Sequence, residues 1–218
     1  MKKGWKIVIV VLGIIIFIPL FFISSVQIGV FGRLPGKKEL ISFRNATASV
    51  VLSHEGETIG RFFSENRITI PFDQMPAHLI NSLVATEDAR FYEHSGIDSR
   101  SLVRVVFKSI LFSDRSSGGG STITQQLAKN MYGRKDYRVF SVILNKTREV
   151  ILAKRIEKVF TKDKILELYL NTVSFGENIY GIEAASQRYF SKKAADLKVE
   201  EAALLTGMLK ANTMYNPR

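Results

Sequence analysis

The stretch that decides the fold is AHLINSLVATEDARFY, residues 77–92. Its apolar residues recur at helical spacing along one stripe: Ile80, Leu83, Val84 and Phe91. This stripe predicts a helix over residues 77–92 that packs on a core. Glu87 falls in the middle of the stripe, and Asp88 lies at its edge. A carboxylate on a core face either has a hydrogen-bonding or charged partner, or its pKa is raised toward the range in which a general acid or base works. The alternative is a structural glutamate bonded to a neighbouring helix, which periodicity alone favours.

A second helical pattern covers residues 142–160 and also turns a glutamate inward. Its apolar face consists of Val142, Leu152, Ile156 and Phe160. Glu149 lies within this face with Asn145 beside it, and basic residues occupy the opposite side. Two inward carboxylates suit sugar chemistry, in which one deprotonates a hydroxyl and the other acts on the leaving side. From the residues alone this pair is a candidate site.

Residues 7–31 form an apolar run without a charge. As a helix the run would be about 37 Å long, enough to cross a hydrocarbon core of roughly 30 Å. The alternative is a cleaved signal peptide, which has a shorter apolar core and a small-residue cleavage site. We therefore expect residues 1–6 to precede a single transmembrane anchor. Basic residues on both sides of the run leave its orientation open.

The composition predicts an anionic partner. The chain has 31 Lys and Arg against 20 Asp and Glu, a formal net charge of +11. Nucleic acid, anionic lipid and a phosphorylated substrate all fit this balance. There is no cysteine, so disulfides and Cys-ligated metals are excluded. The three histidines have no partners at metal-ligand spacing.

Residues 32–76 are expected to join the anchor to the main domain. Residues 32–47 have the composition of a linker, and residues 48–70 alternate as a β-hairpin around a turn at residues 54–57. Beyond Pro76 the patterns are helical, with a glycine-rich interruption at residues 113–121. The sequence thus predicts a mainly α domain over residues 77–218.

Two segments add basic and polar groups. Residues 101–112 are largely apolar, with a basic ridge of Arg100, Arg104 and Lys108. This segment is either a core helix with a solvated edge or a helix in the membrane interface. The run GGSTITQQLAKN, residues 119–130, leads a glycine loop into a helix, where backbone N–H groups and Lys129 could hold a phosphate. It lacks the spacing of a Walker A loop.

Five motifs in order resemble the peptidoglycan glycosyltransferases, the polymerase domains of class A penicillin-binding proteins and of monofunctional transglycosylases. EDARFYEHSG at residues 87–96 is similar to EDxxFxxHxG, and residues 120–130 match GSTxxQQLxKN. KTRE at residues 146–149 resembles the third motif, RKxxE. KDKILELYLN at residues 162–171 resembles the fourth, and EAAL at residues 201–204 with YNP at residues 215–217 resembles the fifth.

The resemblance implies a lysozyme-like helical fold with its active site outside the cytoplasmic membrane. The implied substrate is lipid II, whose growing chain is transferred with inversion to the 4-hydroxyl of an acceptor, releasing undecaprenyl diphosphate. Partners would be lipid II, the nascent glycan chain, membrane lipids and transpeptidases of the cell-wall machinery, and not nucleic acid. No cofactor is required, although some relatives use a divalent metal such as Mg or Mn at the diphosphate.

The resemblance also assigns residues. Glu87 would be the general base and Glu149 the second catalytic carboxylate, with Gln125, Lys129 and Lys146 neutralising the diphosphate. By motif position, the residues that contact substrate would be Asp88, Phe91, His94, Gly96, Ser121, Thr122, Gln125, Gln126, Lys129, Asn130, Lys146, Arg148, Glu167 and Asn171.

The chain departs from the family pattern at Asn145, where the third motif expects arginine. One diphosphate contact is therefore in doubt, and we expect Asn145→Arg to raise turnover unless a neighbour, Arg148 first, already fills that place. Residues 210–214 lack the usual proline of the fifth motif. No SxxK, SxN and KTG set is present, so penicillin binding is not expected. The hairpin resembles the bifunctional class, which fits a shortened member of that class.

Two rival functions remain open at this point. A lytic enzyme that cuts glycan strands would share the fold, but it would need neither a membrane anchor nor a lipid substrate. A non-catalytic cell-wall scaffold would fit a loss of activity through Asn145, but Glu87 and Glu149 are both retained.

Overall fold

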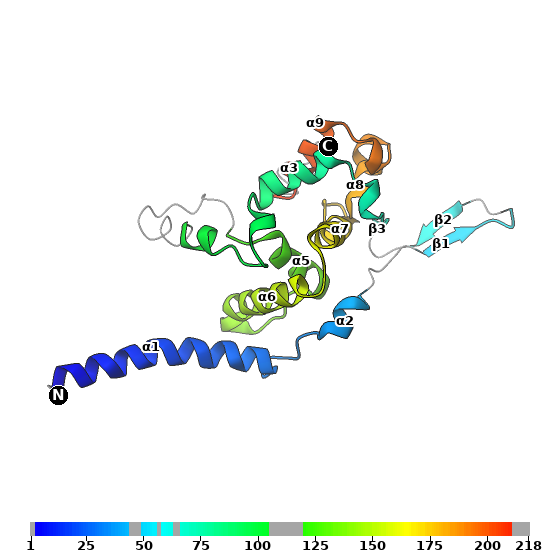
Figure 1. Ribbon diagram of the computed structural model, residues 1–218. Helices are drawn as coiled ribbons and strands as arrows, with labels where there is room; N and C mark the ends of the chain where they lie inside the picture. The colour runs from blue at the N-terminus through cyan, green and yellow to red at the C-terminus, as the bar shows by residue number, and fades with distance from the viewer. Residues whose placement is uncertain (1–2, 44–48, 56–57, 63–65, 105–119, 211–218) are drawn as a thin grey trace.

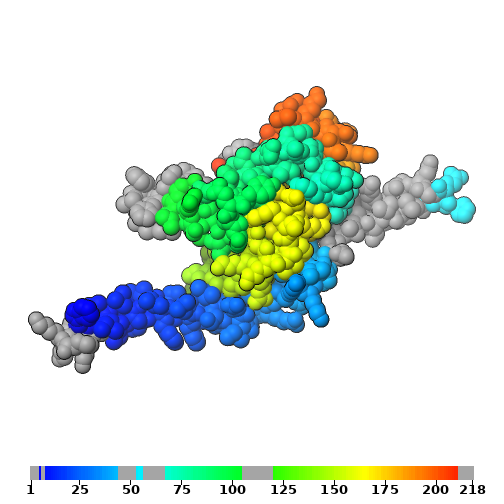
Figure 2. All heavy atoms as spheres, viewed as in Figure 1, coloured from blue at the N-terminus to red at the C-terminus, as the bar shows by residue number. Residues whose placement is uncertain are grey.

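The computed structural model describes residues 3–43, 49–55, 58–62, 66–104 and 120–210. Helix α1 (Lys3–Ile28) is the longest element, and it runs along one edge of the domain (Figures 1 and 2). Its Val8–Ile28 segment is long and apolar enough to cross a membrane, as expected for residues 7–31. Most of its side chains are exposed, but Val26 is fully buried because the end of α1 packs against helix α6.

The segment after α1 is packed on the domain. It contains helix α2 (Lys37–Ile41), and both Leu34 and Leu40 are buried in the core. Arg155 Nη1 donates to the carbonyl oxygens of Leu34 and Pro35 at 3.3 and 2.9 Å. Apolar side chains within the predicted linker, residues 32–47, therefore reach the core, and residues 44–47 lie outside the described residues.

The β structure is small. Strands β1 (Ser49–Leu52) and β2 (Thr58–Phe62) pair antiparallel, with Ser49 opposite Phe62, which confirms the predicted hairpin. A second pairing was not predicted: β3 (Asn66–Arg67) lies parallel to β4 (Ile179–Tyr180). This pairing joins the segment before the helical domain to a loop near its end.

The remaining described elements are helical, as predicted for a mainly α domain. They are η1 (Phe72–Gln74), α3 (Ala77–Glu87), η2 (Phe91–Glu93), α5 (Ile123–Tyr132), η3 (Arg138–Phe140), α6 (Ser141–Glu157), α7 (Lys162–Thr172), α8 (Ile182–Phe190), η4 (Ala194–Asp196) and α9 (Val199–Met208). Helix α5 packs on α6 and α7, while α3 packs on α9 (Figure 1). These three pairings contribute buried residues to the core and bring the motif residues together.

Helix α3 ends five residues earlier than the periodicity predicts. Asp88 leaves the helical conformation, with φ −158° and ψ 72°. Its carboxylate accepts a hydrogen bond from Ile123 N at 3.0 Å and contacts His94 Nε2 at 3.0 Å. Because Asp88 bonds to these partners, the helix ends at Glu87. Phe91 is instead buried in the core from η2.

Helix α6 turns Glu149 inward as predicted, and Leu152 and Ile156 are buried on the same face. The prediction for Val142 is wrong, because its side chain is 82% exposed. Val142 lies on the first turn of α6, and no described element covers that turn on this side.

Candidate active site

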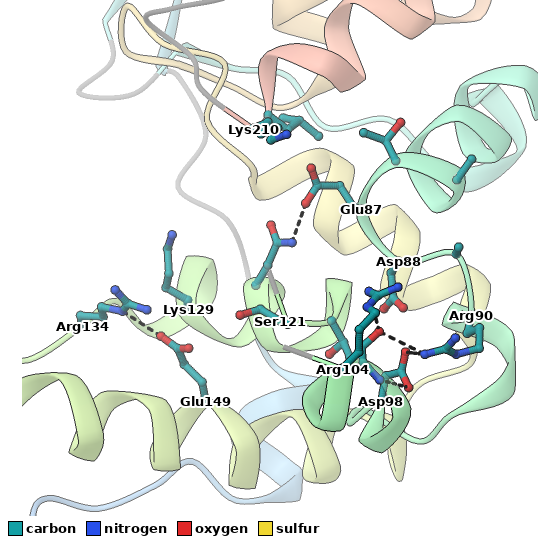
Figure 3. Close-up of a pocket in the computed structure, with 18 residues that line it drawn as sticks. Glu87, Asp88, Arg90, Asp98, Arg104, Ser121, Lys129, Arg134, Glu149 and Lys210 are labelled. Atoms are coloured by element: carbon teal, nitrogen blue, oxygen red, sulfur yellow. Dashed lines mark hydrogen bonds and ion pairs between the residues drawn. The ribbon is translucent and has the colours of Figure 1, made fainter. Parts of the chain in front are cut away.

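A pocket of about 570 Å³ lies where the described motifs meet. This volume is in the range of small-molecule sites. Figure 3 shows Glu87 on one side of it and Glu149 on the other. Its lining residues come from the end of α3, the loop and helical turns after it, the start of α5, the loop after α5, α6 and the end of α9: Ala85, Thr86, Glu87, Asp88, Ala89, Arg90, Asp98, Ser101, Arg104, Gly120, Ser121, Thr122, Gln126, Lys129, Arg134, Glu149, Leu209 and Lys210.

Glu87 is half-buried and is held by a chain of hydrogen bonds. Gln126 Nε2 donates to Glu87 Oε2 at 2.7 Å, and the Tyr169 hydroxyl donates to Gln126 Oε1 at 2.9 Å. Tyr169 is fully buried, and this burial, together with the nearby charge of Glu87, raises its pKa. The hydroxyl therefore remains a donor and fixes the orientation of the Gln126 amide.

Glu149 is buried and receives a cation on each carboxylate oxygen. Arg134 Nε donates to Oε1 at 2.8 Å, and Lys146 Nζ lies 3.2 Å from Oε2. Lys146 Nζ also donates to Ser121 Oγ at 2.6 Å. This cluster joins the glycine-rich motif to α6 and concentrates positive charge on one side of the pocket.

Asp88 and Thr122 line the pocket, and His94 and Gly96, outside its lining, are their hydrogen-bond partners. Thr122 Oγ1 donates to the Gly96 carbonyl at 2.8 Å and accepts from Gln125 N at 3.2 Å as the N-cap of α5. The Asp88 carboxylate accepts a hydrogen bond from Ile123 N. Two backbone N–H groups at this helix start are thus already bonded within the protein, while Lys129 lines the pocket, and the phosphate site stays a prediction.

Nine predicted contact residues lie outside the pocket lining: Phe91, His94, Gly96, Gln125, Asn130, Lys146, Arg148, Glu167 and Asn171. Phe91 is in the core, where Lys162 Nζ lies 4.2 Å from its ring centroid. Asn171 pairs its side-chain amide with the backbone N and O of Ile70 at 3.1 and 2.8 Å. Glu167 forms an ion pair with Lys164. Gln125 is buried, and Asn130 is half-buried on α5.

Arg148 points toward the anchor and not toward the pocket. Its Nη1 donates to the carbonyl oxygen of Gly32 at 2.8 Å, and it lies 3.3 Å from the Phe31 carbonyl oxygen. Asn145 also faces away from the pocket lining and bonds to the backbone of Lys135 and Ser141. Neither residue therefore supplies the cation expected beside Glu149.

A second ionic cluster lines the other end of the pocket. Arg90 Nη2 lies 2.6 Å from Asp98 Oδ2, and Ser101 N donates to Asp98 Oδ1 at 3.1 Å. Burial alone would raise the pKa of Asp98, but hydrogen bonds from Ser101 and Arg90 hold it at about 2. Arg104 also lines the pocket, while the predicted ridge beyond it, including Lys108, lies outside the described residues.

Several residues of the site escaped the sequence analysis, among them Tyr169 and Arg134 around the glutamates and Arg90, Asp98 and Lys210 in the pocket lining. Tyr169 carries a hydroxyl between Leu168 and Leu170 in the fourth motif, and that contrast was the available signal. Arg134 directly follows Gly133, the residue that ends α5, so it begins a loop next to a motif. Among the described residues, no group of three or more His, Cys, Asp or Glu could hold a metal ion.

A helical domain joined to an apolar helix, with two carboxylates across a cation-rich pocket, has the features of a membrane-linked glycosyl-transferring enzyme. A sequence model of the family described as Transglycosylase matches residues 55–218, and the chain belongs to this family. The chain is similar to penicillin-binding protein 1F of Bacillus subtilis, with 39% identity over 99% of the chain and 29% of the relative.

Other relatives agree with this assignment. Penicillin-binding protein 1A of Aquifex aeolicus is 40% identical over 97% of the chain and 28% of the relative. Penicillin-binding protein 1A of Escherichia coli is 40% identical over 85% of the chain and 21% of the relative. The chain therefore spans less than a third of the length of these relatives.

Proposed function

We propose that this domain is a peptidoglycan glycosyltransferase that polymerises lipid II. The acceptor 4-hydroxyl oxygen bonds to the anomeric carbon of the donor chain while the bond from that carbon to phosphate breaks, with inversion. The hydroxyl proton passes to Glu87, and the electron pair of the broken bond leaves with undecaprenyl diphosphate. Atoms and charges balance without a redox partner.

The observation that supports this proposal is that Glu87 and Glu149 line the same pocket but have different hydrogen-bond and ionic partners. Glu87 Oε2 accepts from Gln126, while Oε1 accepts from no described residue and is available to a substrate hydroxyl. Glu149 is surrounded by cations, as the departure of a diphosphate requires. A base on one side and a cationic leaving-group site on the other fit an inverting transfer.

The setting of the pocket supports a lipid-linked substrate. Helix α1 is long and apolar enough to hold the domain at a membrane, where a polyprenyl diphosphate resides. We infer that the domain faces the outer side, where it would meet nascent glycan and transpeptidases. Among the described residues no group of three or more His, Cys, Asp or Glu could hold a metal ion, so a Mg or Mn ion would be bound mainly by the diphosphate oxygens.

The test is to incubate the purified full-length chain in detergent with labelled lipid II, with and without a chelator. We expect glycan polymer, and a chelator-sensitive rate would indicate that a metal takes part. Cleavage of added glycan strands would identify a lytic enzyme. Unchanged lipid II, with normal folding, would indicate a scaffold and overturn the proposal.

A further inference from the structure

The loop after α5 presents a cation that the motifs do not predict. Gly133 ends α5 at φ 65°, a left-handed conformation that glycine adopts without strain, and the chain turns there toward α6. Arg134 follows, with its side chain 56% exposed and lining the pocket. In Figure 3 it lies beside Glu149, on the same side as Lys129.

The guanidinium of Arg134 is only partly used by the protein. Its Nε donates to Glu149 Oε1 at 2.8 Å, and no other described residue accepts a hydrogen bond from it. An arginine has five N–H donors in a planar fork that matches phosphate oxygens. Glu149 thus orients the group through one edge and leaves the other edge for an anion in the pocket.

Asn145 fixes the position of this loop. Its Oδ1 accepts from Lys135 N at 3.0 Å, and its Nδ2 donates to the Lys135 carbonyl at 2.7 Å and to the Ser141 carbonyl at 2.8 Å. The side chain is buried, so these three bonds are shielded from water. The residue they hold most firmly is the direct neighbour of Arg134.

An arginine at position 145 could not replace this arrangement. A guanidinium has donors but no acceptor, so Lys135 N would lose its partner. Asparagine, with one acceptor and two donors, satisfies the N–H and the carbonyl of Lys135 together. The departure from the motif at Asn145 and the presence of Arg134 beside Glu149 therefore belong to one structural arrangement.

We propose that Arg134 binds the diphosphate of the lipid substrate on the Glu149 side of the pocket, and that Asn145 is the positioning residue that holds Arg134 there. This inference rests on the proposed function for the identity of the anion. It places the cation expected at position 145 on a different element, the loop after α5.

The experiment measures binding of a polyprenyl diphosphate to the full-length chain in detergent, with the corresponding polyprenol as a control ligand. Arg134→Ala should weaken diphosphate binding about tenfold, the usual effect of losing a charge-assisted hydrogen bond, and leave polyprenol binding unchanged. Arg134→Lys should restore part of the affinity. Lys135→Ala is the matched control, because it removes an equal charge from the same loop at a residue outside the pocket lining.

A double-mutant cycle tests the role of Asn145. Asn145→Ala should weaken diphosphate binding in the presence of Arg134 and have little further effect in the Arg134→Ala background, because both act through one group. Asn145→Arg should also weaken binding. Additive losses in the cycle, or tighter binding by Asn145→Arg, would overturn the positioning role.

The outcomes separate this inference from the proposed function. If the wild type polymerises lipid II and Arg134→Ala equals it in rate and diphosphate affinity, the inference fails alone. If the wild type makes no polymer but Arg134→Ala loses diphosphate affinity, the anion site stands and the proposed reaction fails.

Discussion

At the residue scale, the site depends on how two carboxylates of the same chemistry are given different surroundings. Glu87 receives an amide donor from Gln126, which Tyr169 orients from the core. Glu149 receives two cations. A group with a neutral partner and an available oxygen suits proton abstraction, whereas a carboxylate between cations organises positive charge around a leaving group.

Glu87→Gln should reduce polymerisation of lipid II by at least about 100-fold, the lower range for a lost general base, while substrate binding persists. The glutamine keeps the size of the side chain and removes only its basicity. Steady-state rates with labelled lipid II provide the measurement. Glu93→Gln, on an exposed position of the neighbouring η2, is the control and should match the wild type. A Glu87→Gln rate near that of the wild type would remove Glu87 from the chemistry.

At the element scale, the pocket depends on close contacts between segments that end or begin there. Gly96 has φ +88°, and a Cβ at this position would lie 3.0 Å from the backbone C and O of Ala153 on α6. Its carbonyl also accepts from Thr122, the N-cap of α5. The loop after α3 therefore fits between α5 and α6 only with a glycine here.

Gly96→Ala should lower the free energy of unfolding by roughly 1–3 kcal/mol, through the left-handed backbone and the contact with Ala153. Denaturant unfolding in detergent measures this change. Gly207→Ala is the matched control, because Gly207 lies in α9 with open space around a Cβ and should be neutral or slightly stabilised. Equal stability of the two variants would contradict the packing argument.

The ion pair at the start of the helical turns at residues 99–104 makes stability depend on pH. The pKa of Asp98 is about 2 in the folded protein, below its usual 3.8, so the unfolded state binds its proton first as pH falls. Its contribution is complete above the unfolded pKa and is lost as pH falls toward 2.

Asp98→Asn should therefore be less stable than the wild type at pH 6 and equal to it near pH 2. We expect a difference of about 1 kcal/mol at pH 6, less than the full shift implies, because the Arg90 side chain is 30% exposed and solvent screens the pair. Unfolding midpoints across this pH range measure it. A difference that does not change with pH would show that the carboxylate charge is not responsible.

At the scale of the whole molecule, the contact between α1 and α6 places an apolar surface beside the anchor. The Tyr137 hydroxyl donates to the Phe31 carbonyl at 2.8 Å. The residues that follow have highly exposed apolar side chains: Val139 (90%), Phe140 (64%), Val142 (82%) and Ile143 (60%). Because these residues adjoin a helix suited to a bilayer, we expect this surface to contact lipid.

The single tryptophan of the chain, Trp5, allows a direct test. In a Trp5→Phe background, Phe140→Trp should be quenched by brominated lipids when the full-length chain is in vesicles. Val199→Trp is the control, since this exposed position begins α9, which Figure 1 shows on the opposite side of the domain from α1. Equal quenching at both positions, or none at Phe140→Trp, would show that this surface does not enter the membrane.

The sequence by itself determined the family, the apolar span, the mainly α class and the inward position of Glu149. These features are encoded locally, in motif spacing and in the period of apolar residues, so they can be recognised without tertiary contacts. The end of α3 was mispredicted because Asp88 breaks the period to reach a partner 35 residues away. The exposure of Val142 was missed because periodicity does not show where a helix passes beyond its neighbours.

Only the tertiary structure decided which side chains surround the two glutamates. Tyr169 reaches Gln126 across 43 residues, and Gln126 reaches Glu87 across 39. Arg134 faces Glu149, whereas Arg148, one residue before it, turns to the anchor. Sequence adjacency on a helix puts neighbouring side chains about 100° apart, so the cation at a site is chosen by the packing of loops and helices and not by proximity in the motif.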